Sequence, residues 1–537
     1  MTVNSKNNNT NLSIINEKFE YVINSPVLLL GIISFIAILI RIYFFPVGIP
    51  IVLDGWGYFW YANDMSILGE FPTTAKGPNN GWPAFLSIFF SLYHSQNFLD
   101  YMALQRIVSA ILSVLTIVPV YLLCRRFFDK HLSMIGAALF VLDPRIIMNS
   151  LLGITEPLFI LLGTSSLVLF FSKDVKKVYF SFVLAALFAL IRYEGLLLVI
   201  PLSIMFIVRF RKEKIFKIAL RYISVLTIFI LVLLPMAYIR IQTTGNDGLI
   251  SHVSAGPAYV STISQKEDGG ARNLVDFFVT GIINLVKYLG WVTIPIFIFF
   301  LPFGVFKFFK NLDYKNTTIL LVSIFFLLPA FYAYGREIQE TRYLYVIFPV
   351  FSMLSLYTVD ILRKRTGKHS LIFILLIGGI IFASILWVDY KWIDLEHEKE
   401  AFTLATNVVK LTSGINEYYP ESTYIGISSI VGKDFPILSK DVPLSNRMQP
   451  LSDVPKFVSA KGTNSIEEYI KFGKEKGLSH LVVDGLGESH LYRSKIFDEV
   501  FYNEKKFPYL IKEYDSAEHG FNYHLKIFRV DYEKFEE

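Results

Sequence analysis

The sequence contains very little cysteine, with Cys124 as the only one among 537 residues. A single cysteine excludes an intrachain disulfide framework and a zinc site built from several thiolates. Charged residues make up only 18% of the chain, and no polar segment carries a long stripe of lysine and arginine. We therefore expect no nucleic-acid partner. Repeats of fixed period are also missing, which excludes a solenoid.

Apolar residues, by contrast, make up 53% of the chain. Repeated apolar runs of about 18 residues or more are typical of helices that cross a bilayer. We therefore predict a polytopic α-helical membrane protein with about eleven transmembrane helices. The predicted spans are 27–45, 102–124, 131–149, 155–172, 178–193, 195–210, 219–240, 284–306, 317–335, 343–362 and 370–388.

Charged residues follow a one-sided pattern along these spans. Every second connection is rich in lysine and arginine, and basic connections favour the cytoplasmic side of a membrane. We therefore predict a cytoplasmic N-terminus, with loops 46–100, 143–155, 241–283 and 336–342 and the chain after residue 389 outside. The basic connections contain Arg125, Arg126, Lys130, Lys173, Lys176, Lys177, Arg209, Arg211, Lys212, Lys214, Lys217, Lys307, Lys310, Lys315, Arg363, Lys364, Arg365 and Lys368.

The composition divides the chain into three predicted parts. Residues 1–26 are expected to be a flexible cytoplasmic tail, residues 27–390 a transmembrane domain, and residues 391–537 a small extracytoplasmic α/β domain. Apolar spacing further predicts helices in the membrane interface at 82–90 and 271–289, a mobile loop at 243–270, a C-terminal helix at 465–477, and strands at 478–484 and 524–530.

Several charged side chains fall at the predicted outer ends of the spans. Asp54 follows the first span and is flanked by glycines and aromatic residues, although it could also be an ordinary polar residue at a helix end. Lys76 could hold a lipid phosphate or simply extend its amine from the membrane surface. Asp143 could merely end a helix. Glu156, between Thr155 and Pro157, has an equally good explanation as the start of a helix.

Two further clusters combine arginine with glutamate. Arg192 and Glu194 lie between two apolar segments that have almost no loop between them, so their charges must face protein or water. They could form a structural ion pair, or the arginine fork could bind phosphate oxygens. Glu340, Arg342 and Tyr343 lie in the densest outer cluster, which could otherwise be an anchoring belt at the interface.

Taken in order, these segments resemble the GT-C superfamily of membrane glycosyltransferases, in particular the protein O-mannosyltransferase and lipid A aminoarabinose transferase group. The resemblance covers most of residues 27–390. It rests on Asp54-Gly55-Trp56-Gly57-Tyr58, Gly81-Trp82-Pro83-Ala84-Phe85-Leu86, Thr155-Glu156-Pro157-Leu158, Arg192-Tyr193-Glu194-Gly195-Leu196, and Glu340-Thr341-Arg342-Tyr343-Leu344 with Pro349. Asp54 is followed by glycine, so the paired Asp-Glu of the O-mannosyltransferases is absent.

The resemblance implies a polyprenyl- or dolichyl-phosphate sugar as donor, and a glycan, protein or lipid acceptor at the extracytoplasmic face. It implies that Asp54 is the catalytic carboxylate and that Lys76 and Arg342 lie near the donor phosphate. Arg192, whose fork matches phosphate oxygens, is a further candidate for binding that phosphate. Glu156, Glu194, Glu340, Tyr58 and Tyr343 are further site candidates. We expect no required cofactor. A divalent metal ion stays an open alternative, and no metal ligands are assigned. The alternatives are a transporter or flippase of a lipid-linked sugar, and a polymerase or ligase that uses a diphosphate-linked donor.

Overall fold

The computed structural model describes residues 25–73, 77, 79–95, 97–265, 274–310, 312–366, 369–412, 414–416, 424, 456–458, 463–485 and 496–537. Lys76 and nearly all of the predicted tail lie outside these ranges. The chain divides into two units. The first comprises the described residues of 1–45, 75–88 and 105–392, and the second those of 46–74, 89–104 and 393–537.

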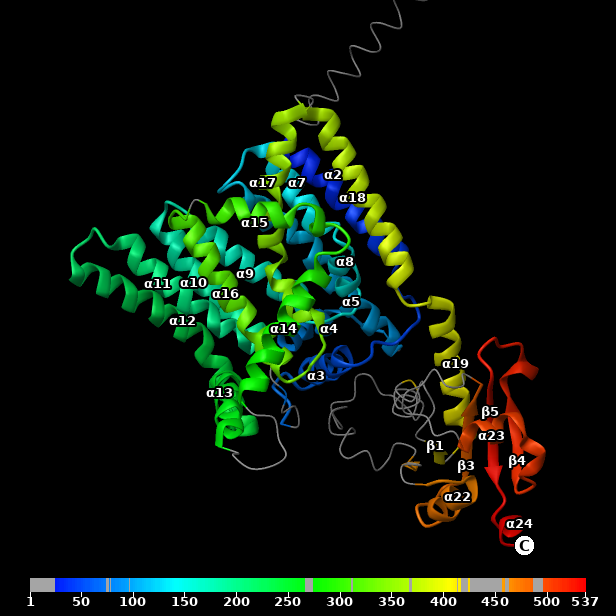
Figure 1. The fold of residues 1–537 in the computed structure, drawn as a ribbon. Coiled ribbons are helices and arrows are strands. Elements are labelled where there is room, and N and C mark those ends of the chain that lie inside the picture. Colours follow the sequence, from blue (N-terminus) through cyan, green and yellow to red (C-terminus); the bar gives the residue numbers. More distant parts are fainter. Residues whose placement is uncertain are drawn as a thin grey trace, which may run out of the picture. The chain divides into compact units, whose positions relative to one another are not determined.

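Helices make up the first unit (Figure 1). Its N-terminal half contains α2 (Pro26–Tyr43), α4 (Gly81–Leu92), α5 (Phe98–Leu115), α6 (Ile117–Cys124), α7 (Lys130–Val141), α8 (Pro144–Ser150), α9 (Glu156–Phe170), α10 (Val175–Ile191), η1 (Tyr193–Leu198) and α11 (Val199–Phe210), with α4 and α5 each crossing the boundary between the units. Its C-terminal half contains α12 (Ile215–Thr244), α13 (Ile250–Gln265), α14 (Leu274–Val292), η2 (Phe297–Phe299), α15 (Leu301–Phe309), α16 (Tyr314–Gly335), η3 (Thr341–Ile347), α17 (Phe348–Thr366) and α18 (His369–Lys391).

The predicted polytopic helical fold is confirmed, whereas the number of spans is not. Among the described residues, eight helices are long and apolar enough to cross a membrane, or nine if α7 and α8 form one span. These two helices are bent by 52° at a break between Val141 and Pro144. Asp143 starts the second of them, because its carboxylate accepts hydrogen bonds from the backbone N–H groups of Arg145 and Ile146 at 2.9 and 3.3 Å.

Two sequence predictions in the C-terminal half of this unit are wrong. The segment 284–306 is not one helix, because α14 ends at Val292 and α15 begins only at Leu301. Pro295 lies in the break and has no backbone N–H to continue a helix. The predicted loop at 243–270 contains α13, whose start is capped by the Asp247 carboxylate. That carboxylate accepts hydrogen bonds from the N–H groups of Leu249 and Ser251 at 3.1 and 3.0 Å.

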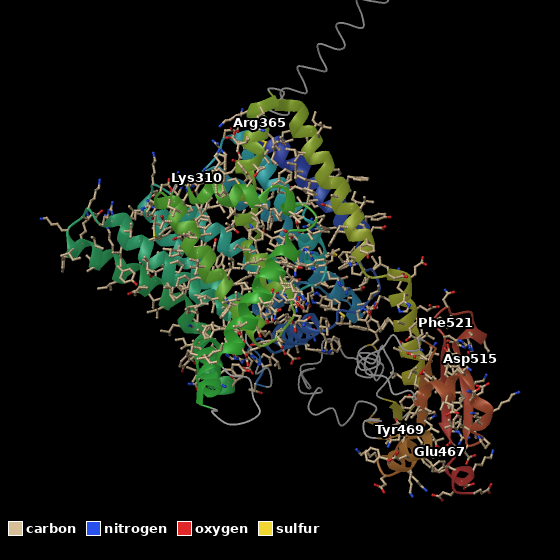
Figure 2. The ribbon with its side chains drawn as sticks, in the orientation of Figure 1. Lys310, Arg365, Glu467, Tyr469, Asp515 and Phe521 are labelled. Carbon is tan, nitrogen blue, oxygen red and sulfur yellow. The ribbon has the colours of Figure 1, made fainter. Side chains whose placement is uncertain are left out.

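The basic connections meet at one end of the first unit. Lys310 and Arg365, which belong to two different basic connections, both lie at this end (Figure 2). Arg363, at the end of α17, forms an ion pair of 2.6 Å with Asp129, which caps α7. Segments far apart in the sequence are therefore joined here.

The second unit contains helix α3 (Asp54–Leu68) and the C-terminal domain. A three-stranded antiparallel sheet with strand order β3-β5-β4 is the centre of that domain. The predicted helix at 465–477 and the predicted strands at 478–484 and 524–530 are confirmed as α22, β3 and β5. The C-terminal elements are α19 (Leu395–Leu411), β1 (Gly414–Asn416), β2 (Lys456–Val458), α22 (Ile466–Lys474), β3 (His480–Asp484), α23 (Ile496–Tyr502), η5 (Glu504–Lys506), β4 (Leu510–Asp515), η6 (Ser516–His519), β5 (Leu525–Val530) and α24 (Tyr532–Glu536).

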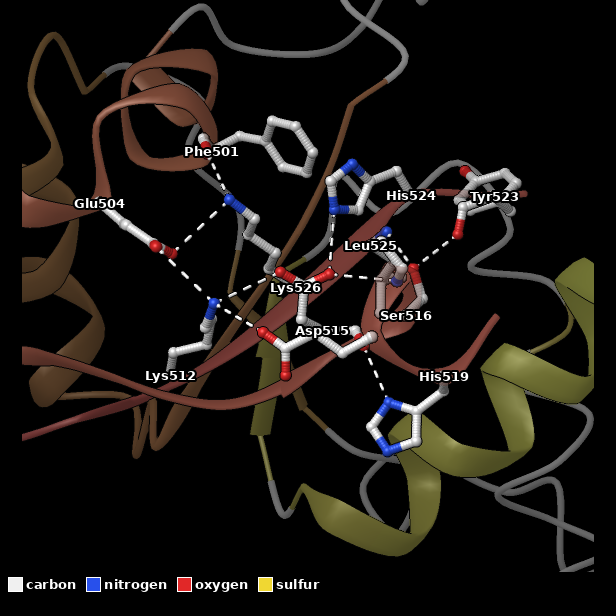
Figure 3. Close-up of polar contacts among 12 residues, drawn as sticks. Phe501, Glu504, Lys512, Asp515, Ser516, His519, Tyr523, His524, Leu525 and Lys526 are labelled. Carbon is white, nitrogen blue, oxygen red and sulfur yellow. Dashed lines mark hydrogen bonds and ion pairs between the residues drawn. The ribbon is translucent and has the colours of Figure 1, made fainter. Parts of the chain in front are cut away.

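Polar contacts at the end of β4 centre on the Asp515 carboxylate (Figure 3). It lies 2.9 Å from His524 Nε2 and accepts hydrogen bonds from the N–H of Ala517 at 3.1 Å and from Lys512 Nζ at 3.4 Å. Burial raises the pKa of Asp515, but the hydrogen bonds from His524, Ala517 and Lys512 together outweigh it and hold that pKa below its ordinary value. The ionised carboxylate therefore stabilises this turn between β4 and β5.

Candidate functional site

Three helix boundaries at the end of the first unit opposite the basic connections supply the candidate site. Glu156 begins α9, where an acidic side chain and the following proline both suit the first turn. Arg192 ends α10 in an extended conformation, and Glu194 then lies in the first turn of η1. Glu340 precedes η3, and its carboxylate accepts a hydrogen bond from the N–H of Arg342 at 3.3 Å.

These boundaries surround a pocket with an empty volume of about 410 Å³. One part of its lining is charged or polar, and the rest is aromatic or aliphatic. A lining of this kind suits a ligand whose apolar part contacts most of the walls while a few polar groups fix its orientation. The lining consists of Glu156, Phe159, Phe188, Arg192, Glu194, Phe325, Phe326, Pro329, Arg342, Tyr343 and Val346.

Arg192 lies between two carboxylates in this pocket. Its Nη1 is 2.6 Å from Glu156 Oε1 and 3.2 Å from Thr155 Oγ1, and its Nη2 is 3.0 Å from Glu194 Oε1. The guanidinium also lies over the Tyr343 ring, 5.7 Å from its centre. Four sequence-predicted candidates, Glu156, Arg192, Glu194 and Tyr343, therefore meet at one place. The arginine there is already neutralised by protein carboxylates.

Arg342 is the second arginine of the pocket, and its environment is more open. Its Nη2 is 3.2 Å from Glu340 Oε2, in a pair whose side chains are 23% and 39% exposed. An exposed carboxylate can leave its partner at little cost, because exposed ion pairs contribute only about 0–1 kcal/mol. Of the two arginines, Arg342 is therefore the one that can more easily exchange its carboxylate for an anionic ligand.

Asp54 and Tyr58 belong to the second unit and lie on α3. Asp54 is exposed in the first turn of that helix, a position where a carboxylate is favourable without any catalytic role. The preceding residue, Leu53, has φ of 55°, a conformation that side-chain-bearing residues rarely adopt. Such strained positions occur often at functional sites. The catalytic role of Asp54 stays a prediction, as does that of Lys76, which lies outside the described residues.

Sequence reasoning missed the aromatic wall of the pocket and its neighbour α13. Phe325, Phe326 and Pro329 come from the middle of α16, where apolar side chains that line a pocket look like those that face lipid. His252 of α13 lies against Tyr193, with ring centres 5.5 Å apart. The sequence carries no signal for this contact, because a Gly- and Ser-containing segment after a span is typical of a loop.

Within the ranges that the structure describes, no group of three or more His, Cys, Asp or Glu side chains is placed to hold a metal ion. The pocket offers carboxylates, guanidinium groups and aromatic rings. The apolar part of its wall strengthens the charges beside it relative to water.

Comparisons with known proteins agree with the sequence-based resemblance. Residues 82–239, less than a third of the chain, match the family of dolichyl-phosphate-mannose-protein mannosyltransferases. This segment contains Glu156, Arg192 and Glu194. No curated protein sequence matches the chain.

Solved structures extend the likeness to most of the chain. The archaeal oligosaccharyltransferase AglB from Archaeoglobus fulgidus, in complex with an inhibitory peptide and a dolichol-phosphate, is 13% identical with a TM-score of 0.51, covering 86% of this chain and 69% of that one. The predicted GT-C-like fold is confirmed. ArnT from Cupriavidus metallidurans bound to undecaprenyl phosphate is 10% identical with a TM-score of 0.48, covering 93% of this chain and 97% of that one.

Proposed function

We propose that this chain is an integral membrane glycosyltransferase. It moves a sugar from a polyprenyl-phosphate donor to an acceptor at the extracytoplasmic face. The observation that carries the proposal is the pocket at the start of α9, the end of α10 and the start of η3, where two arginines and two glutamates face a wall of aromatic and aliphatic side chains. A lipid-linked sugar has the same division into an isoprenoid chain, an anionic phosphate and a polar ring.

The fold and the family match support the same reading. The matched family is named for transfer from dolichyl-phosphate mannose, and its match includes the helices that supply Glu156 and Arg192. The positive-inside rule assigns the end with the basic connections to the cytoplasm, which gives a cytoplasmic N-terminus and an outer pocket. The C-terminal domain then lies outside, where it is available for an acceptor.

The proposed reaction is a direct displacement at the anomeric carbon. The acceptor oxygen forms a bond to that carbon while the bond to the phosphate oxygen breaks, and polyprenyl phosphate leaves. Asp54 takes the acceptor proton as the new bond forms. Arg342, together with Lys76, stabilises the charge that develops on the leaving phosphate. A single carboxylate without a covalent intermediate predicts inversion at the anomeric carbon, as in carboxylate-assisted glycoside chemistry.

The test is transfer by the purified full-length chain. It is incubated with a set of polyprenyl-phosphate sugars and a cell-envelope extract as acceptor, and the released polyprenyl phosphate is measured. Release with at least one donor is expected. Movement of an intact lipid-linked sugar across a vesicle membrane without any release would instead support a flippase and contradict the proposal.

Asp54→Asn tests the assigned base. Asp276→Asn is the matched control, because Asp276 is also an exposed aspartate in the first turn of a helix, α14. We expect Asp54→Asn to lower the rate of transfer at least about a hundredfold, within the usual range for a lost general base. The melting temperatures of both variants should match that of the wild type. Near-normal transfer by Asp54→Asn would remove Asp54 from the mechanism.

A further inference from the structure

The two carboxylate oxygens of Glu194 have different environments. Oε1 pairs with Arg192 Nη2 at 3.0 Å. Oε2 is buried and has no hydrogen-bond partner within the part of the chain that the structure describes. A buried carboxylate oxygen without a partner costs free energy, so a bound group that donates a hydrogen bond would be favoured there. Glu194 lines the pocket and its side chain is 12% exposed, so a turn of the carboxylate toward the pocket brings Oε2 within reach of a donor on a ligand.

The charge balance at this end of the pocket determines which ligand groups fit. Arg192 is shared by Glu156 and Glu194, so one positive charge faces two negative charges. A phosphodiester is an anion and carries no O–H, so it cannot donate to Glu194 and is repelled by the excess negative charge. Carboxylates accept hydrogen bonds only, and they accept them readily from hydroxyl groups. In a polyprenyl-phosphate sugar, hydroxyl groups occur only on the sugar.

We propose that Glu194, held by Arg192 and Glu156, is the sugar-recognition residue of the donor pocket and that the donor phosphate lies toward Arg342 instead. This inference rests on the proposed function. It changes the predicted role of Arg192 from a phosphate ligand to a positioning residue. Glu194 binds one or more hydroxyl groups of the donor sugar and so contributes to the choice of sugar.

The backbone around Glu194 is suited to such a selective contact, because it is fixed on both sides. The N–H of Tyr193 donates to Asn79 Oδ1 at 3.3 Å, and the N–H of Gly195 donates to the carbonyl of Arg192 at 2.8 Å. A Cβ added at Gly195 would lie 2.8 Å from Cα of Ala189, so η1 packs directly against α10. A side chain on a rigid element discriminates between ligands better than one on a mobile loop.

The experiment measures two affinities of the full-length protein in detergent. The probes are undecaprenyl phosphate alone and its mannose, glucose and galactose conjugates, with binding followed by the shift in melting temperature across a ligand titration. For Glu194→Gln, we expect the affinity for the preferred sugar conjugate to fall about tenfold or more, as for a lost hydrogen bond to a charged group. The affinity for undecaprenyl phosphate should change less than about twofold.

Arg342→Gln is the matched comparison from the same pocket. This substitution should lower the affinity for undecaprenyl phosphate and for its sugar conjugates by similar factors, because all of these ligands carry the phosphate. Glu194→Asp retains the charge but shortens the side chain. It should therefore also lose affinity for the sugar conjugate while keeping its affinity for undecaprenyl phosphate. This second variant keeps the test available if Glu194→Gln does not fold.

Several outcomes would overturn the sugar assignment without touching the proposed function. An equal loss for bare and sugar-linked phosphate in Glu194→Gln would place Glu194 at the phosphate. Unchanged donor affinity with a raised KM for the acceptor would place it at the acceptor hydroxyl. Failure of the proposed function looks different, because the wild type itself would then release no lipid phosphate from any conjugate.

Discussion

Replacing Glu156 by glutamine tests whether the ion pair in the pocket also holds the fold together. The side chains of Glu156 and Arg192 are only 4% and 15% exposed, and their closest atoms are 2.6 Å apart. Removing one partner of a buried ion pair costs about 3–5 kcal/mol, because the other charge stays behind. Two features reduce this value. Glutamine retains an oxygen that accepts a hydrogen bond, and Glu194 still pairs with Arg192 at 3.0 Å. We therefore expect a loss of about 2–3 kcal/mol.

Lys364→Gln is the control, because it breaks an ion pair of nearly the same length whose cation is exposed. Lys364 Nζ is 2.7 Å from Asp360 Oδ2, the lysine side chain is 68% exposed, and Asp360 retains Arg363 at 2.9 Å. Exposed pairs contribute about 0–1 kcal/mol. The two substitutions therefore differ mainly in burial.

The measurement is thermal unfolding of the full-length variants in one detergent. We expect the melting temperature to fall several times further for Glu156→Gln than for Lys364→Gln. The melting temperature of Arg192→Gln should fall further still, because this substitution leaves the Glu156 and Glu194 carboxylates without the cation that both of them contact. A melting temperature for Glu156→Gln equal to or above that of Lys364→Gln would refute the reasoning that burial makes this pair important.

Two further predictions concern other parts of the chain. Gly304→Ala places a Cβ 2.1 Å from the carbonyl oxygen of Leu354, so α15 must move away from α17, and the protein should lose at least about 1–3 kcal/mol of stability. Gly290→Ala, with open space around its Cβ, should leave the melting temperature nearly unchanged. For Asp515, the lowered pKa means that its stabilising effect is present above the unfolded value of about 3.9 and is lost as the pH falls through the folded value. Hydrogen exchange at β4 and β5 should therefore separate Asp515→Asn from the wild type at pH 6, and the difference should shrink as the pH falls below about 3.9. An undiminished difference at the lowest pH at which the protein stays folded would contradict this.

The polytopic helical fold follows from the sequence, because apolar runs and basic connections are local signals that the bilayer imposes directly. The number of spans does not follow. An apolar run shows that a segment prefers lipid or a protein core, but not whether it is one helix. The 52° bend between α7 and α8 and the break around Pro295 depend on backbone groups that tertiary neighbours satisfy.

The charged residues of the pocket were also recognisable from sequence, because charge at the end of an apolar span needs an explanation. Their partners were not. The contacts of Arg192 with Glu156 and Glu194 join the start of α9 to the end of α10 and the start of η1. Phe325 and Phe326 line the pocket, but in the sequence they look like any two adjacent apolar residues of a lipid-facing helix. The positions of charged residues along the sequence thus identified the candidates, whereas three-dimensional packing decided which charges neutralise each other.

The sequence by itself determined that this is a membrane protein with basic connections that alternate along the chain and candidate chemistry at the other ends of its helices. Hydrophobicity and charge act residue by residue, so they can be read without a fold. Only the tertiary structure decided that Arg192 is neutralised within the protein and that one oxygen of Glu194 has no hydrogen-bond partner among the residues that the structure describes. Pairing depends on distances between segments that are remote in sequence, and such distances exist only once the helices have packed.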